Sequence, residues 1–412
     1  MIKILKKIFK RMFPPSRLES VNKRLEVLDK KGTEAVNKID TLIKHIEESS
    51  NSIKNEIEKG CNSANERLEK VTVACNLMEK NGEEIKRLIK SNGNGIVDIK
   101  RYLQRKVLYN NDHERKVITS FYDYYNRDDF KDKFLALVKN LDAESIKTIV
   151  RILKRQQMIK GTEGEKLDIL TTEEQDKRIK IKEEFDFGRL KICDDLYCYN
   201  NYFLPVNHFE VSVFIDKHGI DLIEDISKTN NRDIIDAGGF IGDSILILSP
   251  LTRKKVYSFE AVTECFELMQ KTISINKIEN AVAIKSALGA RNEVIDINVA
   301  GSVSSFNVPI ADDMSCQEKV MVITLDEYVE KNDLDVGLIK VDIEGYEQEF
   351  LKGAEKTIKK CKPIMLISIY HNADDFFNIK PLIESWGLDY KFKIHKPKDL
   401  SISREVLLIA EI

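Results

Sequence analysis

The chain has 412 residues, of which 42% are hydrophobic and 33% charged, and its formal net charge at pH 7 is −2. This length allows two or three domains, and the composition suits a globular part joined to a long solvated helical part. A net charge this small excludes a polycation built to bind nucleic acid, so we expect no nucleic-acid partner.

The cysteines and the apolar runs indicate a cytoplasmic protein. The seven cysteines are scattered and contain no C-x-x-C pair: Cys61, Cys75, Cys193, Cys198, Cys265, Cys316 and Cys361. This pattern predicts free thiols in a reducing compartment rather than a structural zinc site. No apolar run approaches the ~18 residues that a membrane-spanning helix needs. Lysines interrupt the first apolar residues, unlike the core of a cleavable signal peptide.

The first segment, residues 1–17, begins M-I-K-I-L-K-K-I-F-K-R-M-F and ends with a proline pair. Wound as a helix, residues 1–13 place their isoleucine, leucine, methionine and phenylalanine side chains on one half and their lysines and arginine on the other. A basic amphipathic helix of this kind suits peripheral contact with the inner face of an anionic membrane. A helix that docks on a protein partner, or one that is frayed in solution, explains the pattern equally well.

Residues 18–105 carry apolar or small residues at spacings of three and four, separated by lysine, glutamate, asparagine and serine. One helix cannot bury such a stripe alone, so we expect a coiled coil and a homo-oligomer. The step from Ile53 to Ile57 indicates a stutter that locally relaxes the supercoil. Residues 106–184 then show further helical periodicity, which predicts a helical connector.

The third part, residues 185–412, alternates strand and helix patterns. We predict five parallel strands at 233–236, 255–260, 281–288, 337–342 and 363–370, because helical segments separate them. The last two strands, at 390–395 and 405–411, are joined by a loop and predict an antiparallel hairpin. Extra strand sequence lies between 288 and 337. The whole pattern predicts a doubly wound, Rossmann-like α/β domain with a seven-stranded sheet and one antiparallel edge.

The first of these strands runs into the turn I-I-D-A-G-G-F-I-G-D-S, which supplies candidate cofactor-binding residues. Gly238 and Gly242 allow a tight turn and close approach of a ligand to the backbone. The spacing does not fit the dinucleotide fingerprint G-x-G-x-x-G. Asp236 and Asp243 flank the turn, and their charge opposes a pyrophosphate. The same charge favours S-adenosylmethionine, which carries an ammonium and a sulfonium group instead. The alternative is that Asp243 only caps the helix and Asp236 only shapes the turn.

Two more strand ends complete the predicted cofactor site. Glu260 ends the second strand, where an acid can accept both ribose hydroxyls of an adenosine. Ser286 and Ala287 follow the third strand and are expected beside the adenine, through backbone groups.

Three charged residues alternate at the end of the fourth strand: Lys340, Asp342 and Glu344. A buried parallel strand normally carries apolar residues, so these charges indicate an active-site crevice. His371 follows the fifth strand and is our candidate for the base that takes a proton from an acceptor hydroxyl. The structural alternatives are an internal Lys340–Asp342 ion pair and a histidine without a catalytic role.

These segments together resemble the FkbM-like methyltransferase family over about residues 185–412. The most specific element is I-K-V-D-I-E-G-Y-E-Q-E-F-L-K-G-A, supported by the glycine turn, Y-S-F-E-A, T-L-D-E-Y and Y-H-N-A-D-D-F. Ala261 departs from the proline that such proteins often have after the glutamate of the second strand. The resemblance implies transfer of a methyl group, usually to a hydroxyl of a sugar or secondary metabolite.

Three functional hypotheses follow from the sequence. The leading one is an S-adenosylmethionine-dependent O-methyltransferase acting on a small-molecule or glycan acceptor, with no metal. A second adds a divalent cation held by Asp342 and Glu344, with His371 as a third ligand, to orient a diol; we do not favour it. The third is a non-catalytic coiled-coil scaffold whose methyltransferase fold binds the cofactor without turnover.

Overall fold

The computed structural model describes residues 112–160, 169–300, 315–397 and 401–412. These residues belong to one compact unit, Leu108–Ile412. The predicted amphipathic helix and coiled coil lie outside the described residues, so these segments, the oligomer and the membrane contact stay predictions. The predicted domain boundaries likewise stay predictions. Within the described residues, no helix is long and apolar enough to cross a membrane.

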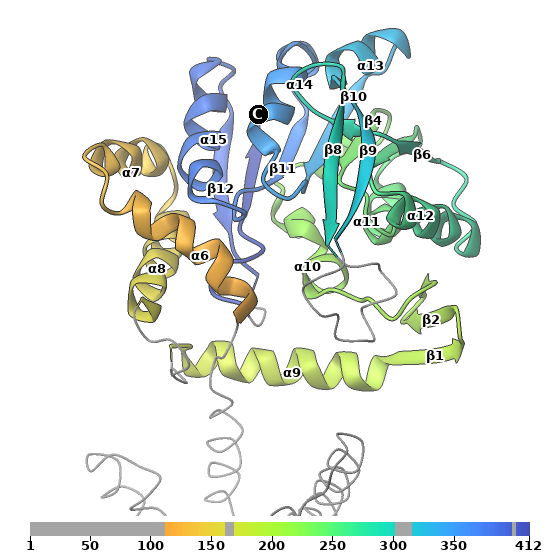
Figure 1. Ribbon diagram of the computed structural model, residues 1–412, viewed down its shortest axis with the longest axis horizontal. Helices are drawn as coiled ribbons and strands as arrows, with labels where there is room; N and C mark the ends of the chain where they lie inside the picture. Colours follow the sequence, from red (N-terminus) through yellow and green to blue (C-terminus); the bar gives the residue numbers. More distant parts are fainter. Residues whose placement is uncertain (1–111, 161–168, 301–314, 398–400) are drawn as a thin grey trace, which may run out of the picture. The chain divides into compact units, whose positions relative to one another are not determined.

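A central sheet of seven strands forms the middle layer, in the order β12-β13-β11-β10-β4-β5-β6 (Figure 1). The five strands predicted to be parallel are parallel. Their bounds are β4 Asp233–Ala237, β5 Val256–Glu260, β6 Ala281–Lys285, β10 Val336–Val341 and β11 Ile364–Ser368. The predicted hairpin is also present, as β12 (Lys391–His395) and β13 (Leu407–Glu411) in antiparallel pairing.

The hairpin forms the predicted antiparallel edge of the sheet, and the structure adds the order of its two strands. β13 is antiparallel to both β11 and β12 and lies between them, so the edge strand is β12. The sequences explain this arrangement. β13 reads L-L-I-A-E and is buried at all five positions, whereas β12 reads K-F-K-I-H and alternates buried with more exposed side chains. A strand with a continuous apolar run is buried by neighbouring strands and helices on all sides, whereas a strand that alternates apolar and polar residues suits the edge of a sheet.

Helices cover both faces of this sheet, and alternate strand residues feed two separate cores. Ile235 and Ile339 point to the face covered by α13 (Leu325–Lys331), α14 (Glu347–Cys361) and α15 (Ala373–Ser385). Ile234 and Leu338 point to the other face, which packs on α11 (Asp243–Leu248) and α12 (Thr263–Ile275). This layering confirms the doubly wound α/β arrangement predicted from the sequence.

Three helices from the predicted connector belong to the first of these cores: α6 (Asp112–Tyr124), α7 (Phe130–Val138) and α8 (Ala143–Ile159). The ring of Tyr124 stacks on Phe377 of α15 with centroids 4.7 Å apart. On α8, Ser145 accepts a hydrogen bond from the backbone of Ile394 in β12. These helices therefore extend the α/β domain at its β12 edge.

The chain then enters α9 (Thr172–Gly188), which begins with a capping box made by Thr171 and Glu174. A small antiparallel sheet follows, composed of β1 (Arg189–Cys193), β2 (Leu196–Tyr199) and β3 (Tyr202–Leu204). The short helix α10 (Val211–Phe214) and the 3-10 helices η1 (Lys217–Leu222), η2 (Ile226–Thr229) and η3 (Ser249–Leu251) complete this side.

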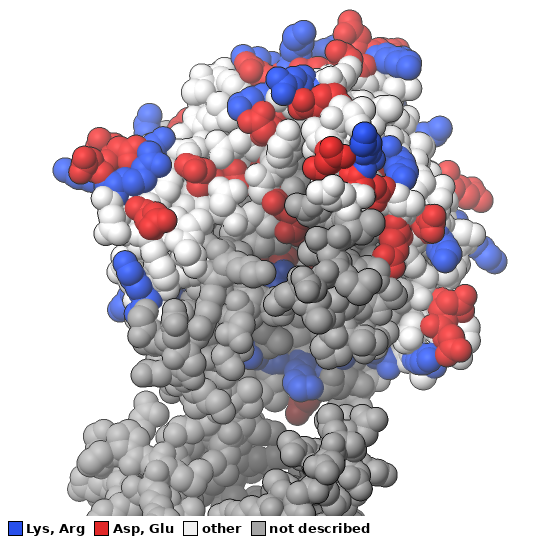
Figure 2. All heavy atoms as spheres, viewed as in Figure 1, with Lys and Arg blue, Asp and Glu red and all other residues white. Residues whose placement is uncertain are grey.

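The extra strand sequence predicted after residue 288 forms a second three-stranded sheet, in the order β7-β9-β8. Its strands are β7 (Ala287–Leu288), β8 (Glu293–Ala300) and β9 (Ser315–Ile323). Figure 2 shows acidic and basic side chains interspersed over the described part of one face of the molecule. This mixture agrees with the near-neutral charge of the sequence.

Candidate active site

All the predicted site residues lie at or just beyond the carboxyl ends of the five parallel strands. Because these ends meet at one edge of the sheet, residues far apart in sequence gather there. Asp236, Gly238, Gly242 and Asp243 belong to the end of β4 and the turn after it, Glu260 ends β5, Ser286 and Ala287 follow β6, Lys340, Asp342 and Glu344 belong to the end of β10, and His371 follows β11.

The turn after β4 requires its glycines. Gly238 has φ +83°, and a Cβ atom there would lie 1.8 Å from the carbonyl oxygen of Asp342. Gly242 also has φ +83°, and it stands directly before α11. The backbone N–H of Asp342 donates to the carbonyl of Ala237 over 2.9 Å. The glycine turn and the end of β10 are therefore in direct backbone contact.

Asp236 is fully buried and organises the strand ends. Its Oδ1 lies 3.0 Å from Nζ of Lys340. Its Oδ2 accepts hydrogen bonds from the hydroxyls of Ser244 and Ser258. Lys340 also donates to the carbonyl oxygen of Gly238 over 2.6 Å. The ion-pair partner of Lys340 is thus Asp236 on the neighbouring strand β4, and not Asp342 at the end of β10. The carboxylate of Asp236 joins β4, β5, β10 and α11 beneath the turn.

Glu260 braces the same turn from β5. Its Oε2 accepts the backbone N–H of Phe240 over 2.8 Å, and its Oε1 accepts that of Val262 over 2.7 Å. A carboxylate has about four lone-pair sites, so each oxygen retains the capacity to accept a further hydrogen bond. Burial raises the pKa of Glu260, against the opposing effect of these backbone donors. The location fits the ribose-binding role predicted for it, which stays a prediction.

Asp243 is buried in the first turn of α11, where it accepts the N–H of Ser244. Burial and the charge of Glu210 raise the pKa of Asp243 to about 7. Glu210 itself contacts His208 over 3.1 Å. The ring of His208 meets Phe240 of the glycine turn edge to face, with centroids 5.2 Å apart. His208 and Glu210 were not predicted, because they lie in a loop without a strand or glycine signal.

Ser286 and Ala287 connect the two sheets. The hydroxyl of Ser286 donates to the carbonyl of Met321 in β9 over 2.8 Å. Ala287 is the first residue of β7 and pairs with Val322. Their predicted contact with adenine stays a prediction.

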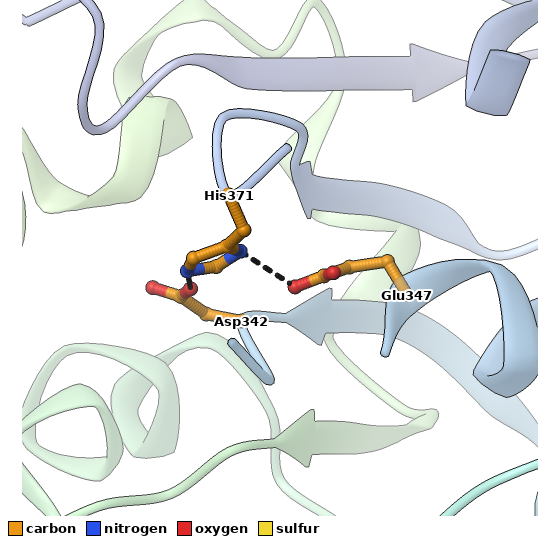
Figure 3. Close-up of side chains that lie close together, drawn as sticks. All are labelled: Asp342, Glu347 and His371. Carbon is orange, nitrogen blue, oxygen red and sulfur yellow. Dashed lines mark ion pairs between the residues drawn. The ribbon is translucent and has the colours of Figure 1, made fainter. Parts of the chain in front are cut away.

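The most concentrated group of ionisable side chains lies beside the glycine turn, where His371 stands between Asp342 and Glu347 (Figure 3). Nδ1 of His371 lies 3.0 Å from Oε1 of Glu347, and Nε2 lies 3.4 Å from Oδ1 of Asp342. The side chains of His371, Glu347 and Asp342 are 7%, 0% and 23% exposed. Glu344 lies 3.6 Å from Nε2, but its side chain is 88% exposed. We call Asp342, Glu347 and His371 the histidine–carboxylate cluster.

The cluster changes the proton affinity of its members. Burial alone lowers the pKa of His371, but the contacts with Glu347 and Asp342 outweigh it and raise the pKa to about 9. Burial raises the pKa of Asp342 to about 6, against the charges of His371 and Lys340. These contacts therefore favour the protonated form of His371. To act as the predicted base, His371 must first lose this proton.

Glu347 is the member of the cluster that the sequence analysis missed. It is the first residue of α14, and its Oε1 accepts the backbone N–H of Ile343. A glutamate in the first turn of a helix normally faces solvent and interacts with the helix dipole. The available signal was the spacing D-I-E-G-Y-E, which puts an acid immediately after a loop that leaves the sheet.

Comparisons with known proteins identify the domain. Residues 236–393 match the family model described as "Methyltransferase FkbM domain". This part of the chain is an FkbM methyltransferase domain. The match begins at Asp236 and includes every predicted site residue as well as Glu347. His208 and Glu210 precede the matched part of the FkbM domain and belong to the segment that leads into it.

Individual proteins are similar at lower identity. "Methyltransferase 1" of Beauveria bassiana (strain ARSEF 2860) is 22% identical over 222 residues, which cover 48% of this chain and 88% of that protein. Among solved structures, the methyltransferase FkbM of Methylobacillus flagellatus KT is 18% identical with a TM-score of 0.43. That match covers 68% of this chain and spans 58% of the length of the other. TYW2 of M. jannaschii, solved in complex with AdoMet, is 15% identical with a TM-score of 0.28, covering 54% and 86% of the two chains.

Proposed function

We propose that the protein is an S-adenosylmethionine-dependent O-methyltransferase that acts on a hydroxyl of a glycan or sugar-containing molecule. The observation that carries this proposal is the direct contact between the glycine turn of an FkbM domain and the strand end that bears the histidine–carboxylate cluster. A cofactor bound along the turn has its methionine end beside Asp342. The acceptor class rests on the family resemblance.

The charges around the turn favour a cationic ligand over a pyrophosphate. Asp243 is buried next to Glu210, and no cation in the described residues is hydrogen-bonded to its carboxylate. The ammonium group of S-adenosylmethionine would offset this negative charge. Glu260 stands one strand away, where its remaining lone pairs can accept the two ribose hydroxyls. The turn, Asp243 and Glu260 together therefore form the proposed cofactor site.

Asp236 and Lys340 have a positioning role in this proposal. Asp236 has no exposed oxygen, and its carboxylate already binds Lys340, Ser244 and Ser258. Lys340 extends that network to the carbonyl of Gly238. The pair fixes the turn against β10, so that a cofactor above the turn and a hydroxyl beside Asp342 are held in a defined geometry.

The cluster receives the acceptor. Asp342 carries the more accessible of the two carboxylates in the cluster, because the side chains of His371 and Glu347 are nearly or completely buried. Glu344, beside the cluster, is more exposed still. We therefore place the acceptor hydroxyl against Asp342, with His371 behind it. In-line attack by the hydroxyl oxygen on the methyl carbon breaks the carbon–sulfur bond as the carbon–oxygen bond forms, and the hydroxyl proton leaves to a base at this cluster.

The direct test is product analysis. The purified full-length chain is incubated with isotope-labelled S-adenosylmethionine and a panel of hydroxyl-bearing glycans, and products are identified by mass spectrometry. We expect label in an ether methyl group of at least one glycan. Cofactor binding without any transfer across the panel, including small-molecule sugars and cell extracts, would favour the scaffold hypothesis instead.

A further inference from the structure

The histidine–carboxylate cluster has the composition of a metal site. One imidazole and two carboxylates each offer a ligand atom, and these atoms all lie within 4.8 Å of one another. They come from three places in the fold: the end of β10, the first residue of α14 and the loop after β11. We propose that Asp342, Glu347 and His371 bind a divalent cation of the Mn²⁺ to Zn²⁺ type, and that this cation contacts the acceptor oxygen.

Unsatisfied polar atoms point to a missing ligand at this position. Oδ1 of Asp342, Oε2 of Glu347 and Nε2 of His371 are buried and have no hydrogen-bond partner in the described residues. The other ring nitrogen, Nδ1, is engaged by Oε1 of Glu347 over 3.0 Å. Buried polar atoms in native proteins are almost always satisfied by protein, water or an ion. One cation would account for these three atoms together, because an imidazole binds a metal ion through a single ring nitrogen (Figure 3).

The charge balance agrees with a cation. Two carboxylates face a single imidazole, and the exposed Glu344 adds a third acid at 3.6 Å. Lys340 acts on Asp342 through its charge, but its ion pair is with Asp236 and it donates to the carbonyl of Gly238. A divalent ion would neutralise this excess of negative charge. Paired imidazole and carboxylate ligands suit first-row divalent metals, and three protein ligands leave positions open for a substrate.

The ligand set differs from the metal hypothesis drawn from the sequence. Glu344 is largely exposed and has φ +58°, which turns the chain away before α14 begins. Glu347, three residues later, takes the buried position beside His371. Glu344 remains outside the ligand set, at the solvent side of the cluster.

This role for the cation rests on the proposed methyl transfer. A hydroxyl bound to a divalent ion becomes more acidic, so its oxygen attacks more readily. The oxygen forms its bond to the methyl carbon as the carbon–sulfur bond breaks, and the cofactor leaves as the neutral thioether. With His371 bound to the cation, the hydroxyl proton passes to Glu344, the exposed carboxylate at the solvent side of the cluster. The cation is not consumed.

Metal binding can be tested without any methyl acceptor. The full-length protein is stripped with EDTA, dialysed and titrated with Mn²⁺ and with Zn²⁺ by calorimetry, and bound Mn²⁺ is also followed by electron paramagnetic resonance. We expect one site per chain. Glu347→Gln and His371→Ala should each weaken binding at least ~10-fold. Glu349→Gln is the matched control, because it removes the same charge from the same helix turn at a side chain that pairs with Lys352 on the surface.

The outcomes separate this inference from the proposed function. If neither ion binds stoichiometrically, or if Glu347→Gln binds like the Glu349→Gln control, the cation site is refuted even where methyl transfer is observed. If the ion binds as expected but no transfer is found, the site stands and the proposed function fails. Should Glu347→Gln not fold by circular dichroism, Asp342→Asn provides the second variant with the same expected loss.

Discussion

Glu347 and His371 are joined by a 3.0 Å contact between Oε1 and Nδ1 in the interior of the FkbM domain. The contact links the first residue of α14 to the loop after β11. Glu347 therefore fixes the orientation of the imidazole from a different element of the fold. The other ring nitrogen is thereby directed to Asp342, which is the accessible end of the cluster.

The first prediction concerns His371. His371→Ala removes the centre of the cluster, so turnover should fall at least ~10²-fold while affinity for S-adenosylhomocysteine stays nearly intact. Initial rates and calorimetry on the same preparation measure both quantities. If turnover survives this change, His371 serves neither as the base nor as a ligand of a catalytic cation.

The second prediction concerns Gly238. Gly238→Ala forces a Cβ atom to 1.8 Å from the Asp342 carbonyl at φ +83°, so the turn must move away from β10. We expect loss of S-adenosylhomocysteine binding, measured by calorimetry. Gly387→Ala is the control, because Gly387 also has positive φ (+64°) but nothing lies within 4 Å of its Cβ position. That control should cost only the ~1–2 kcal/mol of left-handed backbone strain. Equal binding by both variants would contradict the close contact.

The third prediction concerns the buried pair beneath the turn. Lys340→Met removes the ion-pair partner of Asp236, whose carboxyl group remains fully buried. Removing one member of a buried pair typically costs ~3–5 kcal/mol of unfolding free energy. Urea unfolding should show a loss of that size, whereas Lys359→Met, which removes an exposed pair with Glu355, should cost less than ~1 kcal/mol. A loss no greater than in the control argues that the network is dispensable.

The fourth prediction is a pH dependence. Burial raises the pKa of Glu174, but Arg155 and the backbone of Thr171 outweigh it and lower the pKa to about 2. Because the folded pKa is below the usual 4.5, the stabilisation is complete above pH ~4.5 and is lost as pH falls towards 2. Glu174→Gln should therefore cost up to roughly 3 kcal/mol near pH 7. The difference from the parent should shrink by pH 3. A difference that is constant over this range would refute the ion pair between α8 and α9 as its source.

Much of the fold could be predicted because its signals are local. The glycines after β4, the apolar runs of the parallel strands and the acids at their ends all mark the sequence directly. The order of β12 and β13 was not predicted, because it depends on which strand of the hairpin pairs with β11. The alternation in β12 and the continuous apolar run in β13 agree with the order found. Glu347 and Glu210 were missed for another reason. Glu347 meets His371, and Glu210 raises the pKa of Asp243, only because the fold brings together segments that are distant in sequence.

The central claim is that the glycine turn and Glu260 bind S-adenosylmethionine, and calorimetric titration of the full-length protein with S-adenosylhomocysteine tests it most directly. We predict binding at one site per chain. Glu260→Ala should weaken it ~10- to 100-fold through loss of charge-assisted hydrogen bonds to the ribose. Gly242→Val should abolish it, because the added side chain meets Met269 at a residue with φ +83°. Absence of binding in the parent, or unchanged affinity in both variants, would contradict the account.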